Sequence, residues 1–485
     1  MRVLLFACLL MAWTIAKRCG CEAGRIAELK DLLLMAIGLR GVRCALSRSR
    51  RLFSDTSTRP LEANKPSSDV HLNGWVQKSQ RCGSYVFLHL SDGTTANQIQ
   101  IVVPKDLCRT VPVGSAVSVT GRWQSSSGSQ QDFEVLASSC EIMATDADPR
   151  YSSLSPDLLR KNLHLRARSI AFSALLRLRS KLFFKIHEYF INRGYVHIDT
   201  PMLTFNDCEG AGETFSVATT SCSKDDDFFS KKDVFLSVSG QLHLEAMVSG
   251  LSNVYTISNG LRADKQQSRN HLSEFKMLEV EIAFCDNLDQ LLNVCEDVLL
   301  SSVRYFINDP NILKDFESLS PFSSEDHLAA LRSIADSPPF PRVPYADALR
   351  LLVSKNQKIS SSGLSKQNEA FLVSYYNSPV FITHFPSDQK PFYALRSWDE
   401  KLTESFDLLC PFVGELASGS LRETSADKLR SRNPNIEWYT ELRERGKPIS
   451  GGFGMGFDRK LQLLLGIANI KDTVPFPRWF KHCQC

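Results

Sequence analysis

The sequence lacks the patterns of several common protein classes. Its 14 cysteines include no Cys-x-x-Cys pair and no cysteine–histidine cluster at zinc spacing, so reduced thiols fit better than a zinc ribbon or a disulfide framework. No Gly-x-x-x-x-Gly-Lys-Ser/Thr motif occurs, which excludes a P-loop nucleotide site. We find no internal repeat. With 43% hydrophobic and 23% charged residues, the chain has the balance of a folded protein rather than a disordered one.

A strong net charge is lacking too. The formal net charge is +4, but residues 1–60 hold 11 Lys or Arg against 4 Asp or Glu, so residues 61–485 carry a net −3. Neither the net charge of +4 nor the net −3 of residues 61–485 indicates a nucleic-acid binder. Any such role must be argued from local features.

The N-terminus holds no apolar run long enough for a comfortable membrane span, and we expect no membrane association. Val3 to Ala16 is an apolar run of 14 residues that resembles the core of a secretory signal. Residues 35–54 contain five Arg, three Ser and no acid, which is the composition of an organellar transit peptide. We therefore predict a presequence-like extension over residues 1–54, with Met35 as a usable translation start.

The next segment has the pattern of a small β-barrel. Residues 55–68 predict a linker, and residues 69–145 hold five short runs rich in β-branched and aromatic residues between turn residues. Five strands in this length favour a barrel such as the OB-fold, which can bind oligonucleotides. With 7 basic and 9 acidic residues over 61–150, a purely structural barrel stays open. The predicted strands are Val70–Lys78, Tyr85–Leu90, Gln98–Val103, Ala116–Trp123 and Phe133–Met143.

From Pro156 onward, the order of strand-like and helical segments predicts a second domain of α+β class. Strand-like runs alternate irregularly with helical stretches, unlike repeated βαβ units. Residues 160–185 hold eight Lys or Arg and no acid on a helical pattern, which suits either a solvated face or a surface for a phosphate backbone. We assign residues 146–180 to a hinge and residues 181–485 to the second domain, with a mostly helical insertion at about 286–400.

The densest glycine run is Gly451-Gly-Phe-Gly-Met-Gly-Phe-Asp-Arg459, directly before an apolar helix. It is not a dinucleotide fingerprint, because Phe457 stands where the third glycine would be needed. Alternate glycines on a strand let a flat group lie close to the backbone, and an arginine that opens the next helix could reach a phosphate. A tightly packed glycine strand is the alternative.

Two further elements carry chemistry. Gly260-Leu-Arg-Ala-Asp264, a polar loop and Ser268–Phe275 predict a strand–loop–strand in which an arginine could bind phosphate and a phenylalanine could stack on a base. Residues 192–201 predict a helix end that runs into a strand closed by Pro201.

These three elements, in this order, resemble motifs 1, 2 and 3 of the class II aminoacyl-tRNA synthetases. Motif 1 ends at Pro201, motif 2 is the hairpin of Arg262, and motif 3 ends at Arg459. The predicted barrel is similar to the anticodon-binding OB-fold of the aspartate, asparagine and lysine subgroup. The resemblance implies an α+β fold with an antiparallel catalytic sheet flanked by helices.

Within the subgroup, the chain resembles the asparaginyl enzymes, and its presequence the mitochondrial ones. Gly212 stands where an aspartyl enzyme would carry an arginine. The chain departs from the family pattern at Leu261 and Asp264, where motif 2 usually has Phe and Glu, and at Ala417 and Ser418, where glycines are expected. The segments that carry the resemblance are Asp207–Phe215, Ser237–Glu245, His271–Phe275, Gly414–Glu423 and Val474–Arg478.

The resemblance implies roles for individual residues. Arg262 and Arg459 are the expected catalytic residues, which hold the α-phosphate and the γ-phosphate of ATP. Asp407 and Glu415 are the expected Mg²⁺ ligands, unless Asp407 is an ordinary surface carboxylate. The expected ATP-binding residues are Arg262, His271, Glu274, Phe275, Glu415, Gly452, Gly454, Gly456 and Arg459, and the expected asparagine-binding residues are Glu209, Ser239, Gln241, Glu279 and Arg422.

The resemblance also implies how the amide of asparagine is told from the acid of aspartate. Arg422 should donate to the side-chain carbonyl oxygen, which both substrates possess. Leu244 stands where the aspartyl enzymes have a lysine, and Glu279 could accept from the amide NH₂, unless it merely pairs with a neighbouring arginine.

The implied function is asparagine–tRNA ligation in the mitochondrial matrix, with ATP and Mg²⁺ as cofactors and tRNA(Asn) as partner. A homodimer is expected, because motif 1 forms the subunit interface in this family and Pro201 lies there. An aspartyl or dual-specificity enzyme and a non-catalytic tRNA-binding protein are the alternatives.

Overall fold

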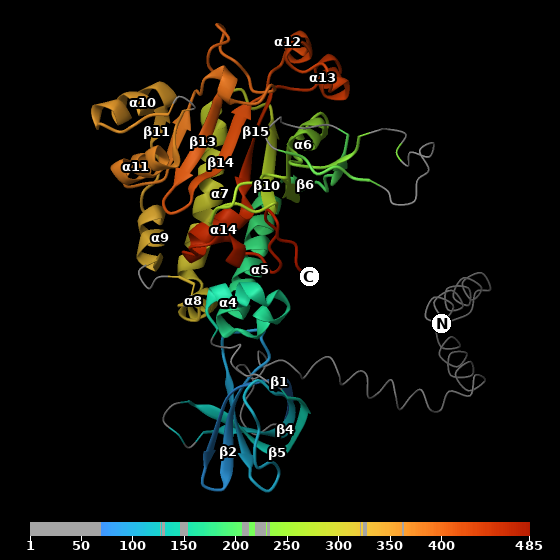
Figure 1. Cartoon of the computed structure of the whole chain (residues 1–485), viewed down its shortest axis with the longest axis vertical. Helices are drawn as coiled ribbons and strands as arrows, with labels where there is room; N and C mark the ends of the chain where they lie inside the picture. Colours follow the sequence, from blue (N-terminus) through green and yellow to red (C-terminus); the bar gives the residue numbers. More distant parts are fainter. Residues whose placement is uncertain are drawn as a thin grey trace, which may run out of the picture. The chain divides into compact units, whose positions relative to one another are not determined.

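The computed structural model describes residues 69–485 apart from 127, 129–130, 146–153, 206–212, 219–228, 230–232, 321, 324–326 and 361–362. The predicted extension, the predicted linker and Glu209 lie outside the described residues. The chain divides into two compact units, residues 1–145 and 146–485 (Figure 1). None of the helices in the described part is long and apolar enough to cross a membrane.

The described part of the first unit, residues 69–145, is a closed five-stranded barrel, as the sequence predicts. The strand order is β1-β2-β3-β5-β4. Alternate residues of β2 point inward, so that Val86, Leu88 and Leu90 are buried while their neighbours are partly exposed. This alternation closes an apolar core inside the barrel. The strands are β1 (Asp69–Cys82), β2 (Tyr85–Ser91), β3 (Ile99–Pro104), β4 (Ala116–Ser125) and β5 (Phe133–Ala144).

The second unit is built on an eight-stranded sheet of order β11-β12-β13-β14-β15-β10-β9-β6. Neighbouring strands are antiparallel except β11–β12 and β6–β9, which are parallel. The α+β class is confirmed, with a mixed sheet. Its strands are β6 (Val196–His197), β9 (Asn253–Leu261), β10 (Glu274–Ala283), β11 (Arg342–Pro344), β12 (Val380–Thr383), β13 (Ser405–Cys410), β14 (Gly414–Leu421) and β15 (Ser450–Gly456), and β7 (Leu203–Thr204) pairs separately with β8 (Phe235–Leu236).

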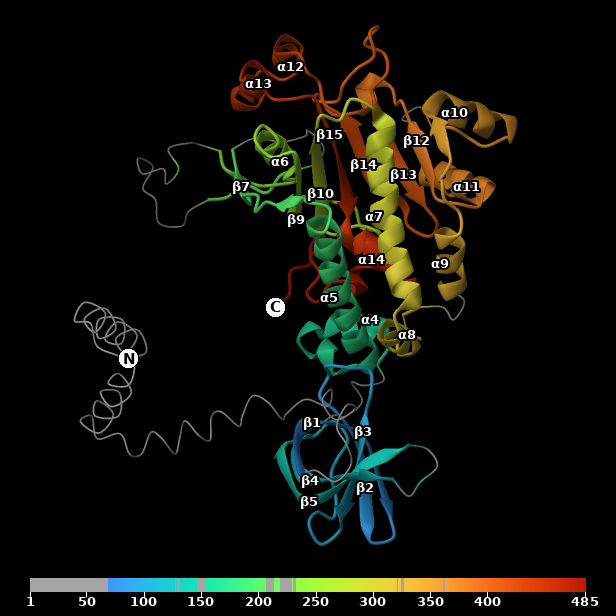
Figure 2. The ribbon, with the colours of Figure 1, turned by 180° about the vertical axis from the view of Figure 1, so that it is seen from behind.

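Helices cover one face of this sheet, where α5 and α7 run along the strands (Figure 2). Side chains of α5, α7 and α14 form one apolar core with Phe406 of β13 and Phe453 of β15. The helices are α4 (Pro156–Lys161), α5 (Ile170–Ile191), α6 (Gln241–Met247), α7 (Leu288–Asn308), α8 (Pro310–Glu317), α9 (His327–Ala335), α10 (Tyr345–Ser354), α11 (Lys366–Tyr376), α12 (Ala426–Arg432), α13 (Glu437–Glu444) and α14 (Phe457–Leu465), with short 3₁₀ helices η3 (Leu163–Arg168), η4 (Ser387–Gln389) and η5 (Ile470–Asp472).

Two predicted boundaries look different in the structure. Helices α4 and α5 and the 3₁₀ helix η3 occupy most of the segment assigned to a hinge, and they belong to the second compact unit. The segment assigned to a helical insertion contains α7, whose apolar face lies in the main core, and β11 and β12, which extend the main sheet. Helical periodicity indicates that α7 is amphipathic but does not say which sheet its apolar face covers.

Several arginines of the basic segment 160–185 point inward. Arg166 is fully buried and its guanidinium lies 3.0 Å from Asp472 Oδ1. Arg177 lies 2.7 Å from Asp315, and Arg179 pairs with Asp458. Buried charges are stable only when paired, so these three arginines have a structural role and are not surface groups for a phosphate backbone.

Candidate active site

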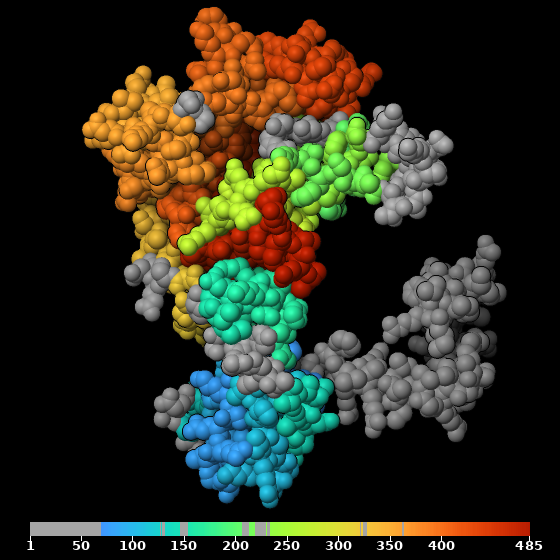
Figure 3. Space-filling view, viewed as in Figure 1, coloured from blue at the N-terminus to red at the C-terminus, as the bar shows by residue number. Residues whose placement is uncertain are grey.

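A cavity of about 470 Å³ lies over strands β10, β14 and β15 of the second unit. In Figure 3 the surface is hollowed between the yellow-green loop before β10 and the orange segments. Most residues predicted for the site line this cavity. They are Ser239, Gln241, Arg262, His271, Phe275, Glu279, Glu415, Arg422, Gly452, Gly454, Gly456 and Arg459.

Three predicted residues do not themselves line the cavity. Glu274 opens β10 and receives a long hydrogen bond of 3.5 Å from Asn259, and Asp407 lies on β13. Pro201 is exposed beside β7. A residue of a subunit interface is expected to be exposed when one subunit is viewed alone.

The three cavity-lining glycines of β15 share one face, because alternate residues of a strand point the same way. A Cβ atom at Gly452 would lie 1.9 Å from Glu281 Oε2, and one at Gly454 would lie 2.8 Å from the Met277 methyl carbon. Gly451 points the other way, against Leu421 in the core. The strand is therefore tightly packed against its neighbours, and its glycines present no side chain to the cavity.

Motif 2 is an antiparallel pair of β9 and β10, which confirms the predicted strand–loop–strand. The Phe275 ring packs on the backbone of Gly260, where a Cβ atom would lie 2.8 Å from the ring. The guanidinium carbon of Arg262 is 5.4 Å from the centre of that ring. A fixed aromatic face and a cation thus line the same part of the cavity.

Arg459 lies in the first turn of α14 and connects two walls of the cavity. One of its Nη atoms donates to the carbonyl oxygen of Glu415 and the other, at 3.5 Å, to that of Asn270. Burial lowers the pKa of nearby His271, and the charges of Arg459 and Lys366 lower it further. This wall of the cavity is positively charged and favours an anionic ligand.

The carboxyl groups of Asp407 and Glu415 form an acidic pair at the edge of the cavity. Burial raises the pKa of Glu415, and the charge of Asp407 raises it further. Asp407 is not a surface group, because its side chain is 16% exposed and lies 2.5 Å from Lys390 Nζ. Among the residues that the structure describes, no group of three or more His, Cys, Asp or Glu could hold a metal ion. A cation bound here would therefore need oxygen atoms from the ligand.

Gln241 opens helix α6 and its side-chain orientation follows from its hydrogen bonds. Its Nε2 donates to the Val280 carbonyl oxygen at 3.0 Å and to Glu281 Oε2 at 2.7 Å. Both amide hydrogens are used inside the protein, so the side chain meets a ligand with its oxygen, an acceptor. Such an acceptor suits the α-ammonium group of an amino acid.

Arg422 is 2% exposed and follows strand β14 at the far end of the cavity. Its Nη2 lies 2.7 Å from Glu281 Oε2, and its Nη1 donates to Ser420 Oγ at 3.0 Å. Burial lowers the pKa of Arg422, but Glu281 and Glu245 outweigh this effect and raise it above its usual range. The guanidinium is a fixed cation.

Glu279 is 1% exposed and is held from three sides. Its carboxylate accepts from Ser239 Oγ, from the Gly240 N–H at 2.9 Å and from Ser258 Oγ at 3.1 Å. The alternative is that Glu279 pairs with a neighbouring arginine, but the nearby Arg422 pairs with Glu281. These contacts fix the carboxylate of Glu279 in the wall of the cavity, which this residue lines.

Three functional residues are not predicted from the sequence. Glu281 orients both Gln241 and Arg422, and Lys366 and Lys390 line the cavity. Glu281 could have been found, because it lies two residues after Glu279 and so shares its face of β10. The two lysines lie in segments without a motif.

Comparison with known proteins gives the family. The model of the class II tRNA synthetases (D, K and N) matches residues 155–480, and that of the OB-fold nucleic acid binding domain matches residues 70–143. The chain belongs to the class II tRNA synthetases. Its first unit is thus an OB-fold domain and its second the class II catalytic domain, and residues of motifs 2 and 3 line the cavity.

Named relatives narrow the subgroup. The chain is 36% identical to an asparaginyl-tRNA synthetase of Mus musculus over 85% of this chain and 91% of that protein. It is 34% identical to an asparaginyl-tRNA synthetase of Homo sapiens over 91% of this chain and 99% of that protein. The crystal structure of asparaginyl-tRNA synthetase from Pyrococcus horikoshii complexed with asparaginyl-adenylate is 27% identical with a TM-score of 0.77, and covers 88% of this chain and 98% of that chain.

Proposed function

We propose that this synthetase is an asparagine–tRNA ligase. It activates asparagine with ATP to asparaginyl-AMP and pyrophosphate, and transfers the aminoacyl group to the 3′ end of tRNA(Asn). The observation that carries the proposal is the joint placement of Arg422 and Glu279 at one end of a cavity whose other end holds Arg262, Phe275 and Arg459.

The chemistry of the first step asks mainly for positioning and charge neutralisation. The carboxylate of the amino acid attacks the α-phosphorus in line with the departing pyrophosphate. Arg262 binds the α-phosphate and the carboxylate, Arg459 binds the γ-phosphate, and Phe275 stacks on adenine. The bare face of β15 gives ATP room to bend. None of these residues has to transfer a proton.

A Mg²⁺ ion fits the acidic pair. Asp407 and Glu415 supply one or two carboxylates, and phosphate oxygens and water would complete the shell. When bound, the ion neutralises phosphate charge. The charge of Asp407 acts on Glu415, so one cation beside the pair would stabilise both ionised carboxylates. Lys390 now neutralises Asp407 and would turn toward a phosphate.

The OB-fold unit is the proposed site for the anticodon. Its exposed aromatic side chains, Trp75, Tyr85 and Phe133, can stack on unpaired bases.

We also propose a homodimer, which motif 1 and the exposed apolar side chains near it support. The side chains of Ile191, Val196 and Met202 are 60%, 42% and 47% exposed. A second subunit that covered them would remove this apolar surface from water. Light scattering should therefore give twice the mass of one chain at micromolar concentration. A monomer at that concentration would contradict the proposed interface.

We also propose a mitochondrial address. The Arg-rich, acid-poor residues 35–54 support it, with Met35 as a usable start. N-terminal sequencing of the mature protein from mitochondria should give a start after Met35, and a start before it would refute the assignment.

Glu279 is the proposed reader of the side-chain amide, and Glu279→Gln tests this. The variant replaces the acceptor by a group that can donate, so use of asparagine should fall by about 10- to 100-fold in kcat/KM. Use of aspartate should fall less or rise, because the like charge is gone. Pyrophosphate exchange with both amino acids measures the two effects. The surface variant Glu444→Gln is the control, and unchanged selectivity in Glu279→Gln would remove Glu279 from this role.

A further inference from the structure

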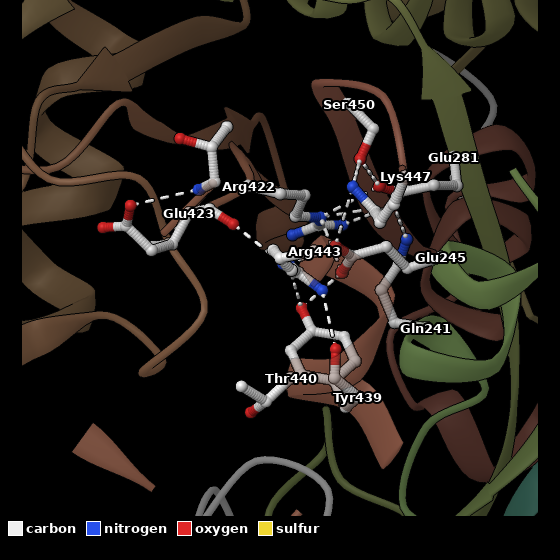
Figure 4. Close-up of polar contacts among 12 residues, drawn as sticks. Gln241, Glu245, Glu281, Arg422, Glu423, Tyr439, Thr440, Arg443, Lys447 and Ser450 are labelled. Carbon is white, nitrogen blue, oxygen red and sulfur yellow. Dashed lines mark hydrogen bonds and ion pairs between the residues drawn. The ribbon is translucent and has the colours of Figure 1, made fainter. Parts of the chain in front are cut away.

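Arg422 belongs to a cluster of buried charges (Figure 4). We call it the ion cluster. It contains two carboxylates and three cations, a net charge of +1, and none of its side chains is more than 3% exposed. Its members are Glu245, Glu281, Arg422, Arg443 and Lys447.

Arg422 contacts both carboxylates of the ion cluster. Its Nη2 is 2.7 Å from Glu281 Oε2, and its Nε is 3.8 Å from Glu245 Oε2. Glu245 therefore lies directly behind the cation that is proposed to bind the asparagine side chain.

Lys447 also reaches both carboxylates. Its Nζ lies 3.1 Å from Glu245 Oε1 and donates to Ser450 Oγ at 2.8 Å, and Ser450 donates in turn to Glu281 Oε1 at 2.8 Å. A third hydrogen bond, of 3.0 Å, goes to the Pro448 carbonyl oxygen. The ammonium group is held on three sides.

Glu245 is fully buried and takes three partners besides Arg422. It accepts from Tyr439 and lies 2.5 Å from Arg443 and 3.1 Å from Lys447. Burial raises the pKa of Glu245, but Arg443, Lys447 and Arg422 lower it below its usual range. It is an ionised group in a place where solvent screens little.

Arg422 and Glu279 line the cavity, and the other members of the ion cluster lie behind them. Counted together, Glu279 and the ion cluster hold three positive and three negative charges. A balanced set of charges suits a neutral side chain. An excess positive charge would favour a carboxylate in the same place, and an excess negative charge would oppose it.

We propose that Glu245 and Lys447, which do not touch the ligand, are positioning residues whose opposite charges tune the pocket toward the amide of asparagine and against the acid of aspartate. The inference rests on the proposed function, in which Arg422 and Glu279 contact the asparagine side chain. Glu245→Gln leaves an excess positive charge that favours aspartate. Lys447→Met leaves an excess negative charge that opposes it. The double variant is balanced again.

The test uses two non-hydrolysable probes, the sulfamoyl-adenosine analogues of asparaginyl- and aspartyl-adenylate, which differ only in amide against acid. Calorimetry on the full chain gives the ratio of their Kd values. Relative to the unmodified protein, the ratio should move about tenfold or more toward the aspartyl analogue in Glu245→Gln, and as far the other way in Lys447→Met. The double variant should return to within about threefold. Glu444→Gln, on the surface of α13, is the charge-matched control.

A merely structural role predicts another result. Both analogues would then weaken together and the ratio would stay within about threefold in every folded variant, which would overturn the inference. If Glu245→Gln does not fold, because it leaves buried cations unpaired, Lys447→Met decides alone by the same ratio. Failure of the unmodified protein to bind either analogue would overturn the proposed function instead.

Discussion

Arg459→Ala is expected to abolish adenylate formation in a folded protein. The guanidinium of Arg459 lines the cavity, where it would neutralise the γ-phosphate, and it donates to two backbone carbonyl oxygens. Alanine can replace neither the charge nor these two hydrogen bonds. Loss of a preorganised donor costs about 10²- to 10³-fold in rate, and loss of a full charge costs at least as much. Pyrophosphate exchange with asparagine measures the effect.

The control for this variant is Arg445→Ala, because Arg445 is a mostly exposed arginine that pairs with Glu441 at the end of α13. It should keep normal exchange. Circular dichroism should show the same helix content in both variants. Normal exchange and a normal KM for ATP in Arg459→Ala would refute the role given to motif 3.

Gly452→Ala is expected to destroy the amino-acid end of the cavity. The added methyl group would lie 1.9 Å from Glu281 Oε2 and 2.5 Å from Arg422 Nη2. These atoms belong to a buried ion pair, which cannot give way without breaking hydrogen bonds that have no replacement from water. Asparagine-dependent exchange should fall by about 10²-fold or more, while an ATP analogue should still bind.

Gly250→Ala is the matched control. A Cβ atom there meets nothing within 4 Å. That variant should keep both exchange and stability. If Gly452→Ala exchanged pyrophosphate normally, the close approach of β15 to the Glu281–Arg422 pair would have no functional meaning.

The barrel and the three motifs could be predicted because their signals are local. Alternating apolar residues mark β2, and the glycines of β15 and the arginines at 262 and 459 stand at fixed positions in short motifs. Each of these patterns depends only on residues close in the sequence. That is why the predicted barrel and the predicted strand–loop–strand of motif 2 agree with the structure.

The charged interior could not be predicted in the same way. In the sequence, Arg166 is one cation among several in a basic segment. In the structure it pairs with Asp472, which follows it 306 residues later in the chain. Glu245 and Lys447 are likewise far apart in sequence. Their meaning depends on which strand lies beside which helix, and no periodicity carries that information. Composition alone therefore suggested a possible nucleic-acid surface where the structure has ion pairs.

The central claim is that the cavity activates asparagine, and pyrophosphate exchange by the full chain with asparagine and with aspartate tests it directly. Because the two amino acids are nearly equal in size, selectivity must come from the charges around their side chains. Asparagine should support exchange, and aspartate should be worse by at least about 10²-fold in kcat/KM. Equal or better exchange with aspartate, or none with either amino acid, would contradict the account.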